Sequence, residues 1–122
     1  GLEILATYGN IGKTYCKVGD PQKGLAFYHK AYQAAKKVKG ETRVGNIARA
    51  LDDIACTYES IGDYNNALEN HLLCLDYVGK AHGETSYRYG KTLRNISRTF
   101  KHLGRVEDAK IFEIRAKLIN HQ

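Results

Sequence analysis

The sequence lacks tryptophan and methionine, has a single proline and contains only three cysteines. The cysteines are odd in number and form no CxxC pair with matching histidines, so neither a disulfide framework nor a zinc site is indicated. No apolar run is long enough to span a bilayer, and no signal or transit segment is visible. These absences predict a cytoplasmic, intracellular chain with reduced thiols, no metal and no other cofactor.

The charge of the chain is concentrated at its C-terminal end. Residues 1–85 hold ten basic and ten acidic side chains, whereas residues 86–122 hold nine and three. A field of one sign at one end attracts an acidic partner and favours one orientation of it. Because the chain begins at Gly1 and has no methionine anywhere, we also expect it to be an excerpt of a longer protein.

One pattern occurs three times along the chain, at steps of 43 and then 42 residues. The segments that repeat are 10–15, 53–58 and 95–100, each followed four residues later by a glycine, at Gly19, Gly62 and Gly104. Periodicity of this length is typical of a solenoid, in which each unit buries its apolar face by stacking on its neighbours. It argues against a unique catalytic centre and places function on a shared surface.

Each unit contains two apolar stripes with three- and four-residue spacing, separated by the glycine turn, and this predicts two helices per unit. In the first unit the stripes are Ile4, Tyr8, Ile11, Tyr15 and Val18, then Leu25, Tyr28, Tyr32, Ala35 and Val38. The last predicted helix has Val106, Ile111, Ile114 and Leu118. We expect an all-α solenoid of three antiparallel helix pairs, a single domain over 1–122 with repeats at about 2–40, 43–82 and 86–121.

Two GKT triplets, at 12–14 and 90–92, suggest a phosphate-binding loop at first sight. A Walker A motif needs a glycine five positions before the glycine of GK, where this chain has Thr7 and Thr85. Both triplets also lie inside helical patterns, whose backbone amides are already bonded. The sequence therefore argues against a nucleotide site.

The residue identities within the unit decide which solenoid is expected. In each unit a small residue precedes an aromatic by three positions, and a glycine follows the aromatic by four. Two further small residues lie on the second helix. In the first unit these residues are Gly12, Tyr15, Gly19, Gly24 and Ala31. This pattern resembles the tetratricopeptide repeat (TPR) over essentially the whole chain. The long unit is similar to the extended repeats of kinesin light chains and LGN-type adaptors. The resemblance implies a right-handed α-solenoid whose first helices line a concave, peptide-binding groove.

The resemblance also assigns positions to this groove. In the third unit four cations follow the spacing i, i+3, i+7, i+10, which confines them to an arc of roughly 80° on the helix. Asn10 and Asn95 match the family asparagine that can bond a peptide backbone as donor and acceptor, while Asp53 replaces it in the second unit. The predicted peptide-binding residues are Asn10, Lys13, Arg49, Asp52, Lys91, Arg94, Asn95, Arg98 and Lys101.

The leading interpretation is a non-catalytic protein-binding module, an adaptor or scaffold, that holds a short peptide with its acidic end over the third unit. A chaperone-type carboxylate clamp is rejected, because Gly9, Lys13 and Asp53 stand at its positions. No nucleophile, base or metal set converges, so neither an enzymatic role nor a small-molecule substrate is predicted.

Two alternatives remain open. The basic face of the third unit is a candidate surface for nucleic acid or an anionic membrane, although this face lacks interleaved aromatics and Trp or Phe anchors. The open ends of the solenoid are candidates for self-association into a homo-oligomer, through exposed residues such as Ile111, Ile114 and Leu118.

Overall fold

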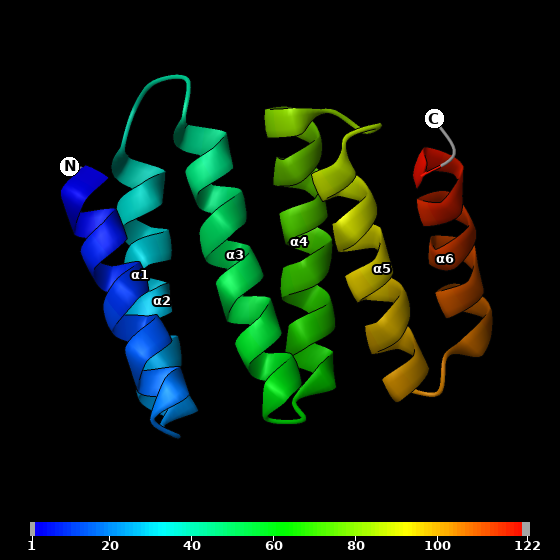
Figure 1. Ribbon diagram of the computed structural model, residues 1–122, viewed down its shortest axis with the longest axis horizontal. Coiled ribbons are helices and arrows are strands. Elements are labelled where there is room, and N and C mark those ends of the chain that lie inside the picture. Colours follow the sequence, from blue (N-terminus) through cyan, green and yellow to red (C-terminus); the bar gives the residue numbers. More distant parts are fainter. Residues whose placement is uncertain (1, 121–122) are drawn as a thin grey trace.

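The computed structural model describes residues 2–120, so Gly1, His121 and Gln122 of the predicted domain lie outside the described part. This part contains helices and turns but no strand, which confirms the all-α class. The helices follow one another side by side, with α1 at one end of the long axis and α6 at the other (Figure 1). They are α1 (Leu2–Lys17), α2 (Pro21–Lys37), α3 (Arg43–Ser60), α4 (Tyr64–His82), α5 (Tyr87–His102) and α6 (Val106–Asn120).

The turn inside each helix pair has the same geometry in all three copies. Gly19, in the turn after α1, has a φ of +90°, a conformation that a residue without a Cβ adopts at no steric cost. The amide of Asp20 then bonds back to the carbonyl of Tyr15 (2.9 Å), and its side chain caps α2 by accepting from the amide of Lys23 (3.2 Å). Gly62 and Gly104 have φ values of +81° and +75° and lie in equivalent turns. The repeated glycine therefore sets the antiparallel pairs.

Small residues allow the two helices of the first pair to approach closely. Gly12 of α1 is buried, and a Cβ built on it would lie 2.8 Å from the ring of Tyr28 on α2. A Cβ on Gly24 would lie 2.3 Å from the Sγ of Cys16. The small positions of the repeat pattern are therefore contact points between helices.

The core continues from one pair to the next, because α2 packs against α3 and α4 packs against α5. Ile47 and Leu51 of α3 share a cluster with Ala35 of α2, and they are 0% and 1% exposed. Leu75 of α4 and Leu93 of α5 belong to the same buried cluster. α3 thus packs between α2 and α4, and α5 packs between α4 and α6, which makes the units mutually dependent.

The apolar stripe of the last helix lies on its exposed side, as the sequence led us to expect for Ile111, Ile114 and Leu118. Val106, Ile111, Ile114 and Leu118 of α6 are between 49% and 66% exposed. The core side of α6 instead carries Ala109, Phe112, Ala116 and Ile119. Small residues decide this rotation of the helix: Ser97 of α5 donates a hydrogen bond to the carbonyl of Ala109 (2.7 Å), which requires the two helices to lie close at that point.

Candidate functional site

Two adjoining cavities lie along α1, α3 and α5. The first, of about 320 Å³, is lined by Asn10 and Lys13 of α1 and by residues of α3 that include Arg49 and Asp53. The second, of about 410 Å³, lies between α3 and α5, and its lining includes Arg49, Asp52, Asp53 and Lys91. The cavities meet at Arg49 and Asp53, which line both.

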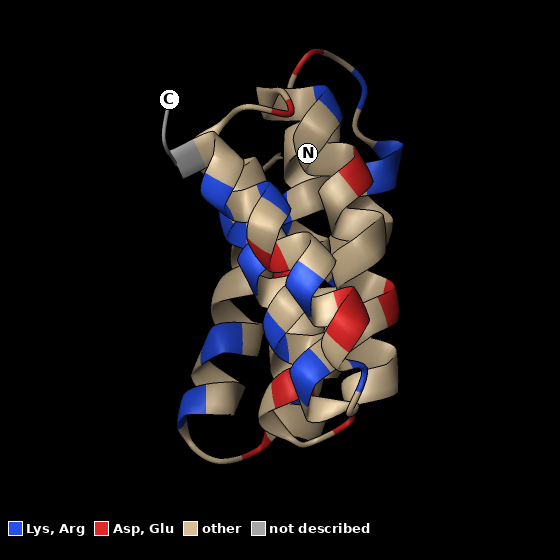
Figure 2. Ribbon diagram, turned by 90° about the vertical axis from the view of Figure 1, so that its right-hand side faces the viewer, with Lys and Arg blue, Asp and Glu red and all other residues tan. Residues whose placement is uncertain are grey.

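A third cavity, of about 460 Å³, lies between α5 and α6. Arg94, Arg98 and Lys101 line it from α5, and Lys117 with Glu113 lines it from α6. Lys117 forms an ion pair with Glu113 (3.8 Å). Figure 2, seen from the α6 end, shows lysine and arginine segments along the nearer helices. We call the linings of these three cavities the groove.

The structure brings eight of the nine predicted residues to the groove, and Asn95 is the exception. Asn95 is buried, and its Oδ1 accepts a hydrogen bond from Nη2 of Arg98 (3.1 Å). It therefore supports an arginine of the groove. The contribution of Lys117 was missed by sequence reasoning, because the resemblance assigned groove positions to the first helices and Lys117 lies on α6.

A polar network joins the second and third repeats beneath the groove. Arg98 of α5 donates to Glu59 of α3 from Nε to Oε2 and from Nη2 to Oε1 (3.1 Å). The same Oε1 lies 3.1 Å from Nε2 of His71, which is fully buried on α4. Nδ1 of His71 has no hydrogen-bond partner within the described part of the chain. Three helices thus share one carboxylate, a link absent from the sequence prediction.

The network fixes the charge of its members. Burial lowers the pKa of His71 below its usual value, although Glu59 opposes this effect. Burial disfavours ionisation of Glu59, but hydrogen bonds from Arg98 and His71 outweigh it and lower the pKa of this carboxyl. At neutral pH the network therefore holds a neutral imidazole, a carboxylate and a guanidinium.

The four predicted cations of α5 consequently differ in availability. Arg98 is paired with Glu59, and the guanidinium of Arg94 lies 5.6 Å from the centroid of the Tyr87 ring. Lys91 and Lys101 are exposed and form no ion pair with any residue from 2 to 119. An incoming anion meets these two ammonium groups without first displacing a carboxylate.

The middle of the groove holds a carboxyl that titrates near neutral pH. Burial, reinforced by the neighbouring Asp52, raises the pKa of Asp53 to about 6, while Arg49 and Lys13 act in the opposite direction. Protonation of Asp53 removes one negative charge at the place where the two cavities meet.

The described residues give no support for other site chemistry. They contain no group of three or more His, Cys, Asp or Glu that could hold a metal ion. Burial raises the pKa of Cys74 to about 12, so this thiol stays protonated and is a poor nucleophile. Of the helices α1 to α6, none is long and apolar enough to cross a membrane.

Comparison with known proteins identifies the family. The model of the tetratricopeptide repeat matches residues 3–77, more than half of the chain, and the chain therefore belongs to the TPR family. No match was found among the curated proteins. As a TPR domain, the chain is in general terms a protein–protein interaction module, a fold class that is typically non-catalytic.

Solved structures share the fold. BtubC (BKLC) from P. vanneervenii superposes with a TM-score of 0.86 at 18% sequence identity, covering 96% of this chain and 46% of the BtubC chain. The TPR domain of Arabidopsis FLU gives a TM-score of 0.82 at 18% identity and covers 98% of both chains. At these identities the likeness shows a TPR-like α-solenoid, and function has to be argued from the groove itself.

Proposed function

We propose that the groove along α1, α3 and α5 binds a short peptide segment of a protein partner. The observation that carries this proposal is that eight residues predicted from three separate repeats line three cavities along the first helices α1, α3 and α5. Their side chains supply donors, acceptors and charge, which an extended peptide needs for its backbone and side chains.

The charges of the groove favour one orientation of the peptide. Lys91 and Lys101, which form no ion pair with the described residues, supply positive charge along α5. Asp52 and Asp53 make the α3 part acidic. An acidic segment over α5 followed by a neutral or basic segment over α3 therefore matches both parts. The domain acts through this contact as a non-catalytic adaptor or scaffold in the cytoplasm.

Peptide display on the immobilised domain tests the proposal. We expect selected peptides to share an acidic cluster at one end. A spin label on the acidic end should broaden the amide signals of α5, and a label on the other end should broaden those of α3. Selection of peptides without acidic residues, or broadening restricted to residues outside the groove, would contradict the proposal.

A further inference from the structure

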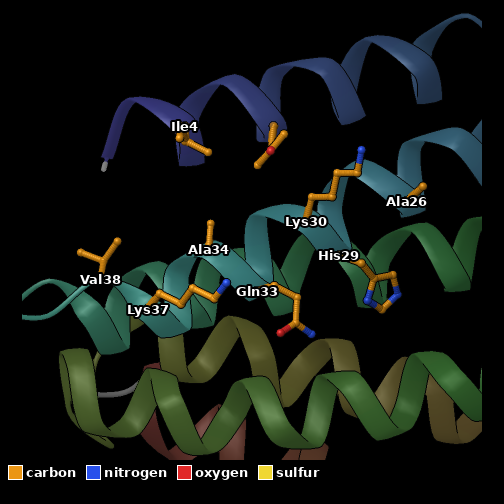
Figure 3. A pocket seen from close by; sticks show the side chains of 9 residues that line it. Ile4, Ala26, His29, Lys30, Gln33, Ala34, Lys37 and Val38 are labelled. Carbon is orange, nitrogen blue, oxygen red and sulfur yellow. The ribbon is translucent and has the colours of Figure 1, made fainter.

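A cavity of about 750 Å³, larger than those of the groove, lies at the α1 end of the solenoid. Ile4 and Tyr8 line it from α1, and Lys30, Ala34 and Lys37 are among its residues on α2. Figure 3 shows Ile4 facing the α2 side chains across the open space. None of its lining residues belongs to the groove.

The repeat register shows what kind of element covers this face elsewhere. Steps of 43 and 42 residues carry the two α1 residues onto positions that are buried in the other repeats. These are Ile47 and Leu51 on α3, beneath α2, and Tyr89 and Leu93 on α5, beneath α4. Ile4, by contrast, is 48% exposed. The cavity therefore presents the surface that a second-type helix covers at the two internal junctions.

The charge around the cavity is of one sign. Its charged lining residues are Lys30 and Lys37, with His29 beside them, and none of the described residues that line it is a carboxylate. The ammonium of Lys30 lies 4.7 Å from the centroid of the Phe27 ring and 5.9 Å from that of Tyr8, which holds it at the edge of the apolar surface. A partner that covers the apolar part of the cavity therefore places the residues beside its own apolar face against Lys30 and Lys37.

We propose that this cavity docks an amphipathic helix of a protein partner with acidic flanks. The helix lies across α1 and α2 as α2 lies on α3 and α4 lies on α5. Its apolar face packs on Ile4 and Tyr8, and its acidic residues face Lys30 and Lys37. This surface is separate from the groove, so the proposal stands or falls independently of peptide binding there.

A second copy of the chain is a poorer occupant, because α6 lacks the required face. Where α2 and α4 carry apolar residues such as Leu25 and Leu68, the same register on α6 carries Lys110. Tyr32 and Leu75 likewise correspond to Lys117. Stacking α6 in the manner of the internal junctions would bury these two ammonium groups without a carboxylate from the cavity.

Two synthetic probes test the docking site. Both are alanine-based helical peptides of about 18 residues with leucines at three- and four-residue spacing; one has glutamates flanking the leucines and the other has lysines. Titration into the isotope-labelled domain should shift the amide signals of Ile4, Tyr8 and Ala34 with the glutamate peptide. The lysine peptide should bind at least about tenfold more weakly than the glutamate peptide.

Charge-reversal variants separate this site from general electrostatics. Lys30→Glu combined with Lys37→Glu should invert the preference between the two peptides. The matched control, Lys17→Glu with Lys110→Glu, changes the net charge equally at exposed lysines outside the cavity and should retain the preference. Equal binding of both peptides, shifts confined to the groove or α6, or a dimer that Ile4→Ser abolishes would overturn the proposal.

Discussion

Arg98 and Glu59, on first helices of neighbouring repeats, are joined by two hydrogen bonds. The Glu59 side chain is 11% exposed and also contacts the buried His71, so one carboxylate connects α3, α4 and α5. These hydrogen bonds fix the position of the third repeat relative to the second, in addition to the apolar packing between them. It also removes Arg98 from the set of cations that an anionic ligand meets without competition.

Loss of Glu59 should destabilise the domain more than loss of a groove cation. Glu59→Ala leaves His71 and Arg98 without their shared acceptor, and we expect the free energy of unfolding to fall by about 2 kcal/mol. Lys101→Ala, at an exposed position that has no ion pair with the described residues, should change it by less than about 0.5 kcal/mol. Urea unfolding monitored by circular dichroism makes the comparison, and similar values for both variants would refute a stabilising role of the network.

The imidazole of His71 should titrate below its usual range. Burial lowers its pKa, and Glu59 favours the protonated form, so Glu59→Gln should lower the pKa further. Because the folded-state pKa lies below the unfolded value, the contribution of this histidine to stability is complete above pH 6.5. It decreases as the pH drops below 6.5 and is lost once the pH has passed the folded-state pKa. NMR titration of the ring protons measures the pKa of His71 in the unmodified domain and in the Glu59→Gln variant. A rise on Glu59→Gln is the opposite of the expected result.

Two glycines of α1 provide a matched test of helix approach. Gly12→Ala places a Cβ 2.8 Å from the Tyr28 ring and should destabilise the domain by about 2 kcal/mol. A Cβ built on Gly9 would have no described atom within 4 Å apart from its chain neighbours and its own helix backbone. Gly9→Ala should therefore stabilise the domain by about 0.5 to 1 kcal/mol through helix propensity. Thermal or urea unfolding of the pair suffices. Equal effects of the two substitutions would mean that close packing at Gly12 does not matter.

Asp53 should limit stability at neutral pH. Its pKa in the folded state is raised to about 6, against about 3.9 when unfolded, so the ionised carboxylate opposes folding above pH 6. Asp53→Asn should raise the free energy of unfolding by about 1 kcal/mol at pH 7, after allowance for solvent screening, and should have little effect at pH 4. The exposed Asp76→Asn serves as the control. An equal gain at both pH values would contradict the assigned cause.

Local signals account for what the sequence predicted well. The glycine of each turn has positive φ, and Asp20 caps the following helix, so the pairs follow from interactions within a few residues. Because the units repeat, residues at equivalent positions of the first helices are expected to lie on the same surface. For this reason Lys13, Arg49 and Lys91 could be placed on a common surface before the structure was known.

Tertiary geometry accounts for what the sequence did not predict. The pairing of Arg98 with Glu59 depends on the relative rotation of two helices whose residues are 39 positions apart. The stripe of Ile111, Ile114 and Leu118 showed that α6 has an apolar face, but not whether another element covers it. The same is true of Ile4: periodicity identifies a face, whereas burial depends on a neighbour.

The affinity of an acidic-ended peptide, measured by fluorescence anisotropy, tests the central claim most directly. Lys91→Glu combined with Lys101→Glu should weaken binding at least about tenfold and reduce its dependence on salt. Lys23→Glu combined with Lys110→Glu makes the same change of net charge outside the groove, and it should leave the affinity within about twofold. Equal losses in both double variants, or no loss in the first, would contradict peptide binding in the groove.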